Sequence, residues 1–125
     1  MKLPIIINDN ALFDRPGDLC VYDSVKAAEL ACEPPDADDP SINAFDIEGR
    51  ALKIVKRDFS CVDLVAAEDT PTHGDIVEKL LRTFAERHLP EIECSGKSVE
   101  EVAWAIFQSN PNSYSGMPPQ KPENT

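Results

Sequence analysis

Cysteine and histidine are the side chains in this sequence that could carry nucleophilic chemistry, because a thiolate beside an imidazole can attack an electrophilic carbon. The two histidines are His73 and His88. The four cysteines stand singly and form no Cys-x-x-Cys pair, so their spacing selects none of them as a nucleophile or a zinc ligand. We interpret them as buried, reduced thiols. A small enzyme that uses Cys20 or Cys61 with a histidine is an alternative.

Carboxylates are the other candidate for chemistry. Asp36, Asp38 and Asp39 are spaced like ligands of a calcium loop, but the glycine and the distal glutamate of such a loop are missing and the flanking prolines oppose its curl. The sequence also contains no glycine-rich phosphate loop, no Gly-x-Ser-x-Gly elbow and no His-Glu-x-x-His motif. We therefore predict no catalytic, cofactor-binding or metal-binding residue, and we expect a binding protein rather than an enzyme.

The charge balance restricts the class of partner. The chain has 125 residues, a net charge of -11 and a pI near 4.4. Such a field repels nucleic acid and anionic membrane surfaces, and it attracts a basic protein. No apolar run approaches the roughly 20 residues that cross a bilayer, and polar residues interrupt the first apolar run before a signal-peptide core can form. We predict a soluble, cytoplasmic protein with no nucleic-acid or membrane partner.

The positions of the acidic residues indicate where a basic partner would bind. An acidic, proline-rich segment at 33–40 lies between predicted elements, a further aspartate precedes a predicted strand, and an acidic pair follows that strand. Loops at the ends of neighbouring elements can converge on one rim; the alternative is that these loops are merely solvated. The predicted partner-binding residues are Glu33, Asp36, Asp38, Asp39, Asp58, Glu68 and Asp69.

Short β-prone stretches must position these loops. Ile5–Ile7 is predicted to be an extended segment and a candidate edge strand, and further strands are expected at 19–22, 42–45, 52–55 and 61–65. Residues 46–50 suit a hairpin turn, with Gly49 where a left-handed backbone is needed. The segment 33–40 offers no apolar anchor, so we expect it to be exposed. An antiparallel meander is the economical arrangement of these strands.

Capping residues mark three helix starts. Ser24 precedes a segment whose apolar residues recur at helical spacing. Thr72, followed three residues later by Asp75, is predicted to cap the longest helix. The capping box Ser98–Glu101 opens a second C-terminal helix, in which we expect Trp104 to lie in the core.

Together these elements predict the α+β class, with a small antiparallel sheet of about four strands packed by two or three helices. The apolar patterns end near residue 108, so we expect residues 1–108 to form a single α+β domain. Residues 109–125 consist mainly of polar residues, proline and glycine, which is typical of a mobile tail.

Three stretches of the sequence resemble a known group of proteins. They are residues 17–29 (GDLCVYDSVKAAE), Glu33-Pro34 and residues 44–52 (AFDIEGRAL). The resemblance is to small bacterial proteins encoded beside secreted polymorphic toxins of the contact-dependent-inhibition and Rhs kinds, which are immunity proteins. It implies a protein that binds a cognate toxin domain and acts by occlusion, so it transfers no catalytic residue and no cofactor.

We therefore predict an immunity protein that binds a basic, cognate toxin domain and covers its active site or substrate groove. Two alternatives stay open. One is the small cysteine-dependent enzyme, and the other is a non-catalytic adaptor that docks through its C-terminal helix, which carries Trp104 and Phe107.

Overall fold

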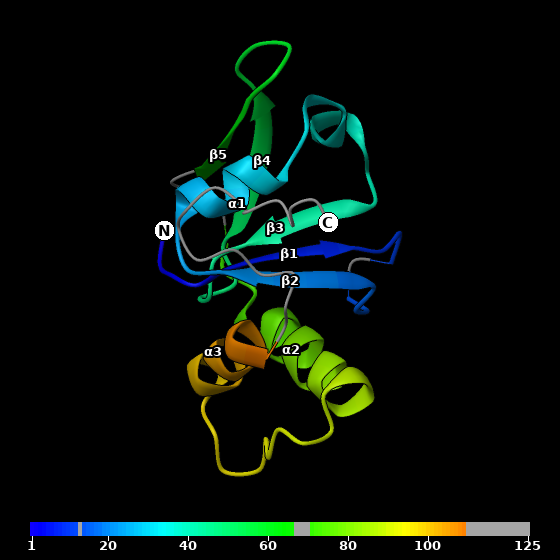
Figure 1. The fold of residues 1–125 in the computed structure, drawn as a ribbon, viewed down its shortest axis with the longest axis vertical. Coiled ribbons are helices and arrows are strands. Elements are labelled where there is room, and N and C mark those ends of the chain that lie inside the picture. The colour runs from blue at the N-terminus through cyan, green and yellow to red at the C-terminus, as the bar shows by residue number, and fades with distance from the viewer. Residues whose placement is uncertain (13, 67–70, 110–125) are drawn as a thin grey trace, which may run out of the picture.

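Five antiparallel strands form one sheet in the order β2-β1-β3-β4-β5 within the residues that the computed structural model describes, 1–12, 14–66 and 71–109 (Figure 1). The α+β class and the antiparallel sheet are confirmed, with five strands in place of about four. The strands are β1 (Ile5–Asp9), β2 (Asp18–Tyr22), β3 (Ile42–Phe45), β4 (Ala51–Lys56) and β5 (Val62–Ala66). The helices are α1 (Val25–Ala31), the short 3-10 helix η1 (Pro34–Asp38), α2 (Gly74–His88) and α3 (Val99–Ser109). Ser109, the first residue of the predicted tail, is the last residue of α3. The rest of the predicted tail, residues 110–125, lies outside the described residues.

Strand β1 lies in the interior of the sheet, so the prediction of an edge strand is wrong. Its Ile6 lies opposite Val21 of β2 on one side and opposite Phe45 of β3 on the other. Burial explains this place, because Ile5 and Ile6 point to opposite faces and neither is accessible to solvent. The expected meander therefore holds only for β3, β4 and β5, whereas the chain that leaves β2 passes through α1 and η1 to reach the far side of β1.

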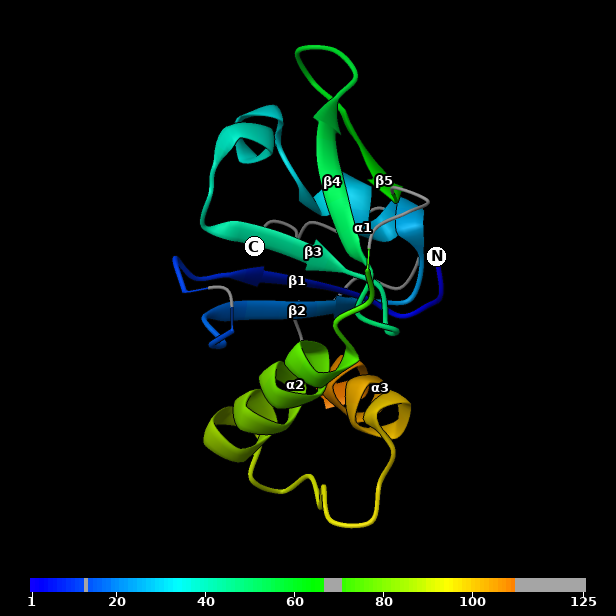
Figure 2. The ribbon, with the colours of Figure 1, turned by 180° about the vertical axis from the view of Figure 1, so that it is seen from behind.

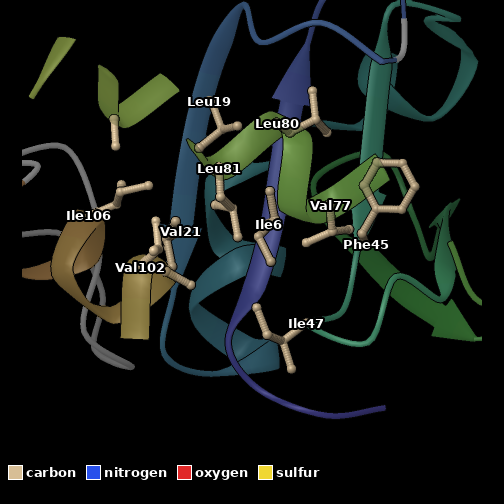
Figure 3. Packing of buried hydrophobic residues seen from close by; sticks show 12 residues of the cluster. Ile6, Leu19, Val21, Phe45, Ile47, Val77, Leu80, Leu81, Val102 and Ile106 are labelled. Atoms are coloured by element: carbon tan, nitrogen blue, oxygen red, sulfur yellow. The ribbon is translucent and has the colours of Figure 1, made fainter. Parts of the chain in front are cut away.

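Helices α2 and α3 cover one face of β2, β1 and β3 (Figure 3). The helical spacing of their apolar residues places these side chains on one stripe of each helix, and that stripe meets the sheet. The buried side chains of the helices are Val77, Leu80, Leu81, Ala85, Val102, Ala103 and Ile106, and those of the sheet side are Ile6, Leu19, Val21, Phe45 and Ile47.

Helix α1 covers the opposite face of the sheet. Its buried residues Ala27 and Ala28 pack in a second cluster with side chains from all five strands. Ala37 of η1 packs against the same cluster, so the segment 33–40 is not wholly exposed and that prediction is wrong. The strand residues of the cluster are Ile5, Tyr22, Ala44, Leu52, Ile54, Val62 and Leu64.

Beyond Ala51, which packs against the α2–α3 cluster, strands β4 and β5 are covered on one face only. All of their buried side chains belong to the α1 cluster. On the other face Lys53 is exposed and Val65 is 46% exposed. The β4–β5 hairpin projects from the molecule at the end opposite to α2 and α3 (Figures 1 and 2). This hairpin can therefore carry its tip far into solvent.

A buried aspartate shapes the turn between β3 and β4. The Asp46 carboxylate accepts hydrogen bonds from the backbone N–H groups of Lys2 at 3.1 Å, Glu48 at 3.0 Å and Arg50 at 2.8 Å. Gly49 in the same turn has a φ of 89°, which confirms its predicted left-handed conformation.

Local capping signals predicted two helix starts and failed at the third. The hydroxyl of Ser24 accepts a hydrogen bond from the Ala27 N–H, and Ser98 and Glu101 form the predicted capping box. In α2 the N-cap residue is His73 and not Thr72. The reason is tertiary: Thr72 forms a β-bridge to Arg50, and the His73 N–H donates to the Gly49 carbonyl at 2.8 Å. Backbone pairing with the β3–β4 turn thus replaces the local cap.

Trp104 is partly buried and belongs to neither core cluster, so its predicted core position is wrong. It lies off the stripe that Val102, Ala103 and Ile106 form on α3. Its ring stands edge-to-face to Phe107, with the ring centroids 5.7 Å apart.

Candidate docking surface at the β4–β5 hairpin

The tip of the β4–β5 hairpin presents a phenylalanine to solvent. Phe59 is 96% exposed. The adjacent Asp58 orders the turn, since its Oδ1 accepts hydrogen bonds from the Ser60 N–H at 2.8 Å, the Ser60 hydroxyl at 2.9 Å and the Cys61 N–H at 2.9 Å. The hydrogen bond from the Ser60 N–H contributes most to lowering the pKa of the Asp58 carboxyl below its ordinary value, and the other two hydrogen bonds act in the same direction. The exposed ring therefore stands on an ordered, negatively charged turn.

Below its tip the hairpin is tied on two sides. Arg57 of the tip pairs with Asp63 of β5, and this hydrogen-bonded pair lowers the pKa of the Asp63 carboxyl. On the α1 side, Glu29 Oε2 accepts the Leu64 N–H at 2.8 Å. This hydrogen bond occupies a donor of β5, an outermost strand of the sheet, and so blocks strand addition at that point. The tip is thus held in a fixed position relative to α1.

An open hollow of about 740 Å³ lies beside the Phe59 ring, between the hairpin and η1. The Lys56 ammonium and the Asp38 carboxylate, 2.7 Å apart, bridge these two elements. The apolar part of the lining comes from the phenyl ring and two prolines, and the polar part from the ion pair and Asp58. The lining residues are Pro34, Pro35, Asp38, Lys56, Asp58 and Phe59.

A second hollow of about 110 Å³ lies between the hairpin and α1. Arg57 and Cys61 line it from the hairpin, and Leu30, which is 46% exposed, lines it from α1. Exposed apolar groups among charged ones are typical of protein-binding surfaces. We call the residues that line these two hollows the hairpin surface.

The predicted partner-binding acids do not form one continuous rim. Asp38 and Asp58 meet at the hollow beside Phe59. Asp36 lines a different hollow, and it accepts the Glu33 N–H at 2.8 Å. Asp39, just after η1, is exposed. Glu68 and Asp69 lie outside the described residues.

The linings of the two hollows hold three acidic and three basic side chains, Glu29, Asp38 and Asp58 with Lys26, Lys56 and Arg57. Lys56 is matched by Asp38 and Arg57 is matched by Asp63. Four of the predicted acids have no ion-pair partner among the described residues, and of these only Asp58 lines the hollow beside the exposed ring. These four are Glu33, Asp36, Asp39 and Asp58.

Reasoning from the sequence missed Phe59 and Leu30. The sequence did contain one signal for Phe59. This large aromatic residue stands between Asp58 and Ser60, in a turn between two predicted strands, where no periodic apolar pattern explains it. Leu30 carried no such signal, since it falls within a helix whose other apolar residues are buried or partly buried.

The structure does not bring Cys20 together with a histidine. Cys20 packs against the α1 cluster, whereas His73 and His88 stand at the two ends of α2 on the other face of the sheet. Burial raises the pKa of the Cys20 thiol, and burial with the nearby carboxylates raises that of Cys32 to about 11. Cys61 is exposed on the hairpin, with its Sγ 3.5 Å from the Ser60 hydroxyl.

Comparisons with known proteins add no identification. The sequence matches no family model, no curated protein and no solved structure. Among the described residues, no group of three or more His, Cys, Asp and Glu side chains could hold a metal ion. In the same part of the chain, no helix has the length and apolar character needed to cross a bilayer. The resemblance to immunity proteins stays a prediction, and the hairpin surface is the feature from which function is inferred.

Proposed function

We propose that this protein binds a basic protein domain through the hairpin surface, and that this domain is a bacterial toxin whose active site or substrate groove it covers. The observation that carries the proposal is Phe59, 96% exposed on a turn ordered by Asp58. The class of partner comes from the resemblance of residues 17–52 to immunity proteins.

The Phe59 ring has the properties of a binding anchor. Aromatic residues that become buried in a partner's pocket commonly cost about 2 kcal/mol or more of binding free energy when truncated. The ordered turn lowers the entropy that is lost on binding. Because the ring contributes almost nothing to the core, its removal should change the free energy of unfolding by less than about 0.5 kcal/mol.

The charge of the molecule supports a basic partner. With a net charge of -11 and the Asp58 carboxylate free of an ion pair beside the ring, the protein attracts a cationic domain over distances longer than a contact. Such steering raises association rates by about 10- to 1,000-fold at low salt. Occlusion of an enzyme's substrate groove needs this rapid and specific association and needs no chemistry from the inhibitor.

The test is a binding titration with the toxic domain encoded next to this protein. Phe59→Ala is expected to raise Kd by about 30-fold, which corresponds to about 2 kcal/mol. Leu12→Ala is the matched control, because Leu12 is an apolar residue 53% exposed on the β1–β2 loop, and its removal should leave Kd unchanged. Equal Kd values for Phe59→Ala and the wild type would exclude the hairpin surface. Failure of the wild type to bind at micromolar concentration would exclude the toxin.

The charges are tested by a variant that keeps the local hydrogen bonds. Asparagine at positions 36, 38 and 39 retains an oxygen acceptor for the Glu33 and Ser41 N–H groups and removes three charges. We expect association with the toxin domain to slow by about tenfold at low salt, and this difference to disappear at high salt. The melting temperature should stay close to that of the wild type. An unchanged association rate at low salt would remove the acidic segment from the interaction.

A further inference from the structure

We infer that the side chain of the partner that enters the hollow beside Phe59 is an arginine. This inference rests on the proposed function, because it names what the hairpin surface captures. The hollow is open, has a volume of about 740 Å³ and combines a phenyl ring and two prolines with the carboxylates of Asp38 and Asp58.

Flat apolar walls beside carboxylates favour a guanidinium group. The guanidinium is planar and weakly hydrated, so it can stack on the Phe59 ring while its N–H groups donate to carboxylate oxygens. Pro34 and Pro35 offer apolar surface along which its methylene groups can lie. A lysine ammonium is a compact and strongly hydrated charge that gains less from a flat wall.

Asp58 has an acceptor available for this contact. The three hydrogen bonds of the turn all go to its Oδ1, and its Oδ2 accepts none among the described residues. The same hydrogen bonds lower the pKa of the carboxyl, so the group is ionised at neutral pH. The free oxygen therefore carries charge on a residue that lines the hollow together with Phe59.

Lys56 is an internal competitor for the second carboxylate. Its Nζ lies 2.7 Å from Asp38 Oδ2, and the two side chains are 51% and 74% exposed. An ion pair whose two side chains are this exposed to solvent is weak, and its partners exchange readily. An entering arginine must displace Lys56 from Asp38, so removing the lysine charge should strengthen capture of the arginine.

The experiment is an NMR titration of the whole protein with N-acetyl-arginine amide as the probe. N-acetyl-lysine amide and the uncharged N-acetyl-citrulline amide are the matched controls, at equal ionic strength. We expect the backbone amides of Phe59, Ser60 and Cys61 to shift, with arginine binding at least about threefold more tightly than lysine and with no saturable shift for citrulline. Equal affinity for arginine and lysine, or shifts confined to other residues, would overturn the inference.

Substitutions at three exposed residues test the contribution of each group to arginine binding. The amide spectrum of each variant shows whether its fold is intact. Phe59→Leu keeps apolar bulk but removes the aromatic face, and Asp58→Asn keeps the Oδ1 acceptor but removes the charge. Each should weaken arginine binding by about threefold or more. Lys56→Gln should instead tighten it by about twofold, because it frees Asp38. Weaker binding in Lys56→Gln, or unchanged binding in Phe59→Leu, would contradict the inference.

Binding of the toxin domain separates this inference from the proposed function. If Phe59→Ala weakens the complex while replacing each toxin arginine with lysine leaves Kd unchanged, the arginine is excluded and the docking surface stands. If the toxin does not bind but the arginine probe gives the expected shifts, the proposed partner is wrong and the chemistry of the hollow stands.

Discussion

The two ends of the sheet are stabilised in different ways. Strands β2, β1 and β3 lie between α1 on one face and α2 with α3 on the other, so apolar side chains are buried on both sides of them. The β4–β5 hairpin is covered on one face, by α1 and η1, and its tip is ordered by hydrogen bonds to Asp58 and by the Arg57–Asp63 pair. Burial on both faces of the sheet holds one end of the molecule, whereas burial on one face, with polar contacts at the tip, holds the other.

This difference separates stability from binding. The hairpin buries apolar side chains on one face only, those of Leu52, Ile54, Val62 and Leu64, and its tip adds none to either core cluster. Phe59 can therefore be exposed at small cost to the fold, because its ring takes no part in the core. Changes in the covered half should affect stability, and changes at the tip should affect binding.

The largest effect is expected from a substitution in the covered half. Leu80 of α2 is fully buried against the sheet (Figure 3). Leu80→Ala should lower the free energy of unfolding by about 3 kcal/mol, from lost burial and from the cavity left behind. Phe59→Ala is the matched comparison and should change it by less than about 0.5 kcal/mol. Urea denaturation of both variants measures this difference, and similar losses would contradict the division between the two ends.

The second-largest loss of stability is expected at the turn between β3 and β4. This turn joins the two ends of the sheet and is held by hydrogen bonds to Asp46. Asp46→Ala leaves the N–H groups of Lys2, Glu48 and Arg50 without their acceptor in a buried place. The free energy of unfolding should fall by about 2 kcal/mol. Asp46→Asn keeps an oxygen acceptor and should lose less. Both variants remove the charge, so equal losses would show that charge, and not hydrogen bonding, is the dominant contribution.

A smaller effect is expected at the outer edge of β5. Glu29→Ala removes the acceptor of the Leu64 N–H and should lower the free energy of unfolding by about 1 kcal/mol. Hydrogen exchange of the Leu64 amide should accelerate, while exchange in β1 stays slow. Glu29→Gln keeps an acceptor and serves as the control. Uniform acceleration across the sheet would mean that the hairpin and the covered half unfold as one unit.

The features that the sequence predicted are those set by residues close together in the chain. The caps at Ser24 and Ser98 and the left-handed Gly49 depend on neighbours within a few positions. The apolar stripe of α2 follows from its helical period, so its contact with the sheet was also predictable.

The features that escaped prediction depend on segments far apart in the chain. The interior place of β1 depends on which strands pair with it, and Thr72 loses its capping role to the bridge with Arg50. The same holds for the candidate site. Asp38 and Asp58 were each predicted as binding residues, but only the packing of η1 beside the hairpin brings them to one hollow with Phe59.

The smallest effect is expected from acid, and within the sheet it should appear at the hairpin alone. The Ser98–Glu101 capping box, where hydrogen bonds also lower the pKa of Glu101, lies outside the sheet at the start of α3. The pKa values of Asp58 and Asp63 lie below the ordinary value of 3.8, because each carboxylate accepts hydrogen bonds in the folded hairpin. Their contribution to stability is therefore fully present above pH 3.8 and is lost as the pH falls through the lowered values. The protection factors of the Ser60 and Cys61 amides, measured by NMR below pH 4 and referred to the intrinsic exchange rate at each pH, should fall while that of Ile6 stays high. Asp58→Asn, which keeps the acceptor without the titrating group, should remove most of this pH dependence at the tip. Simultaneous loss of protection at Ile6 and Ser60 would show that the hairpin has no separate stability, and the contrast between the two ends would then not extend to their dynamics.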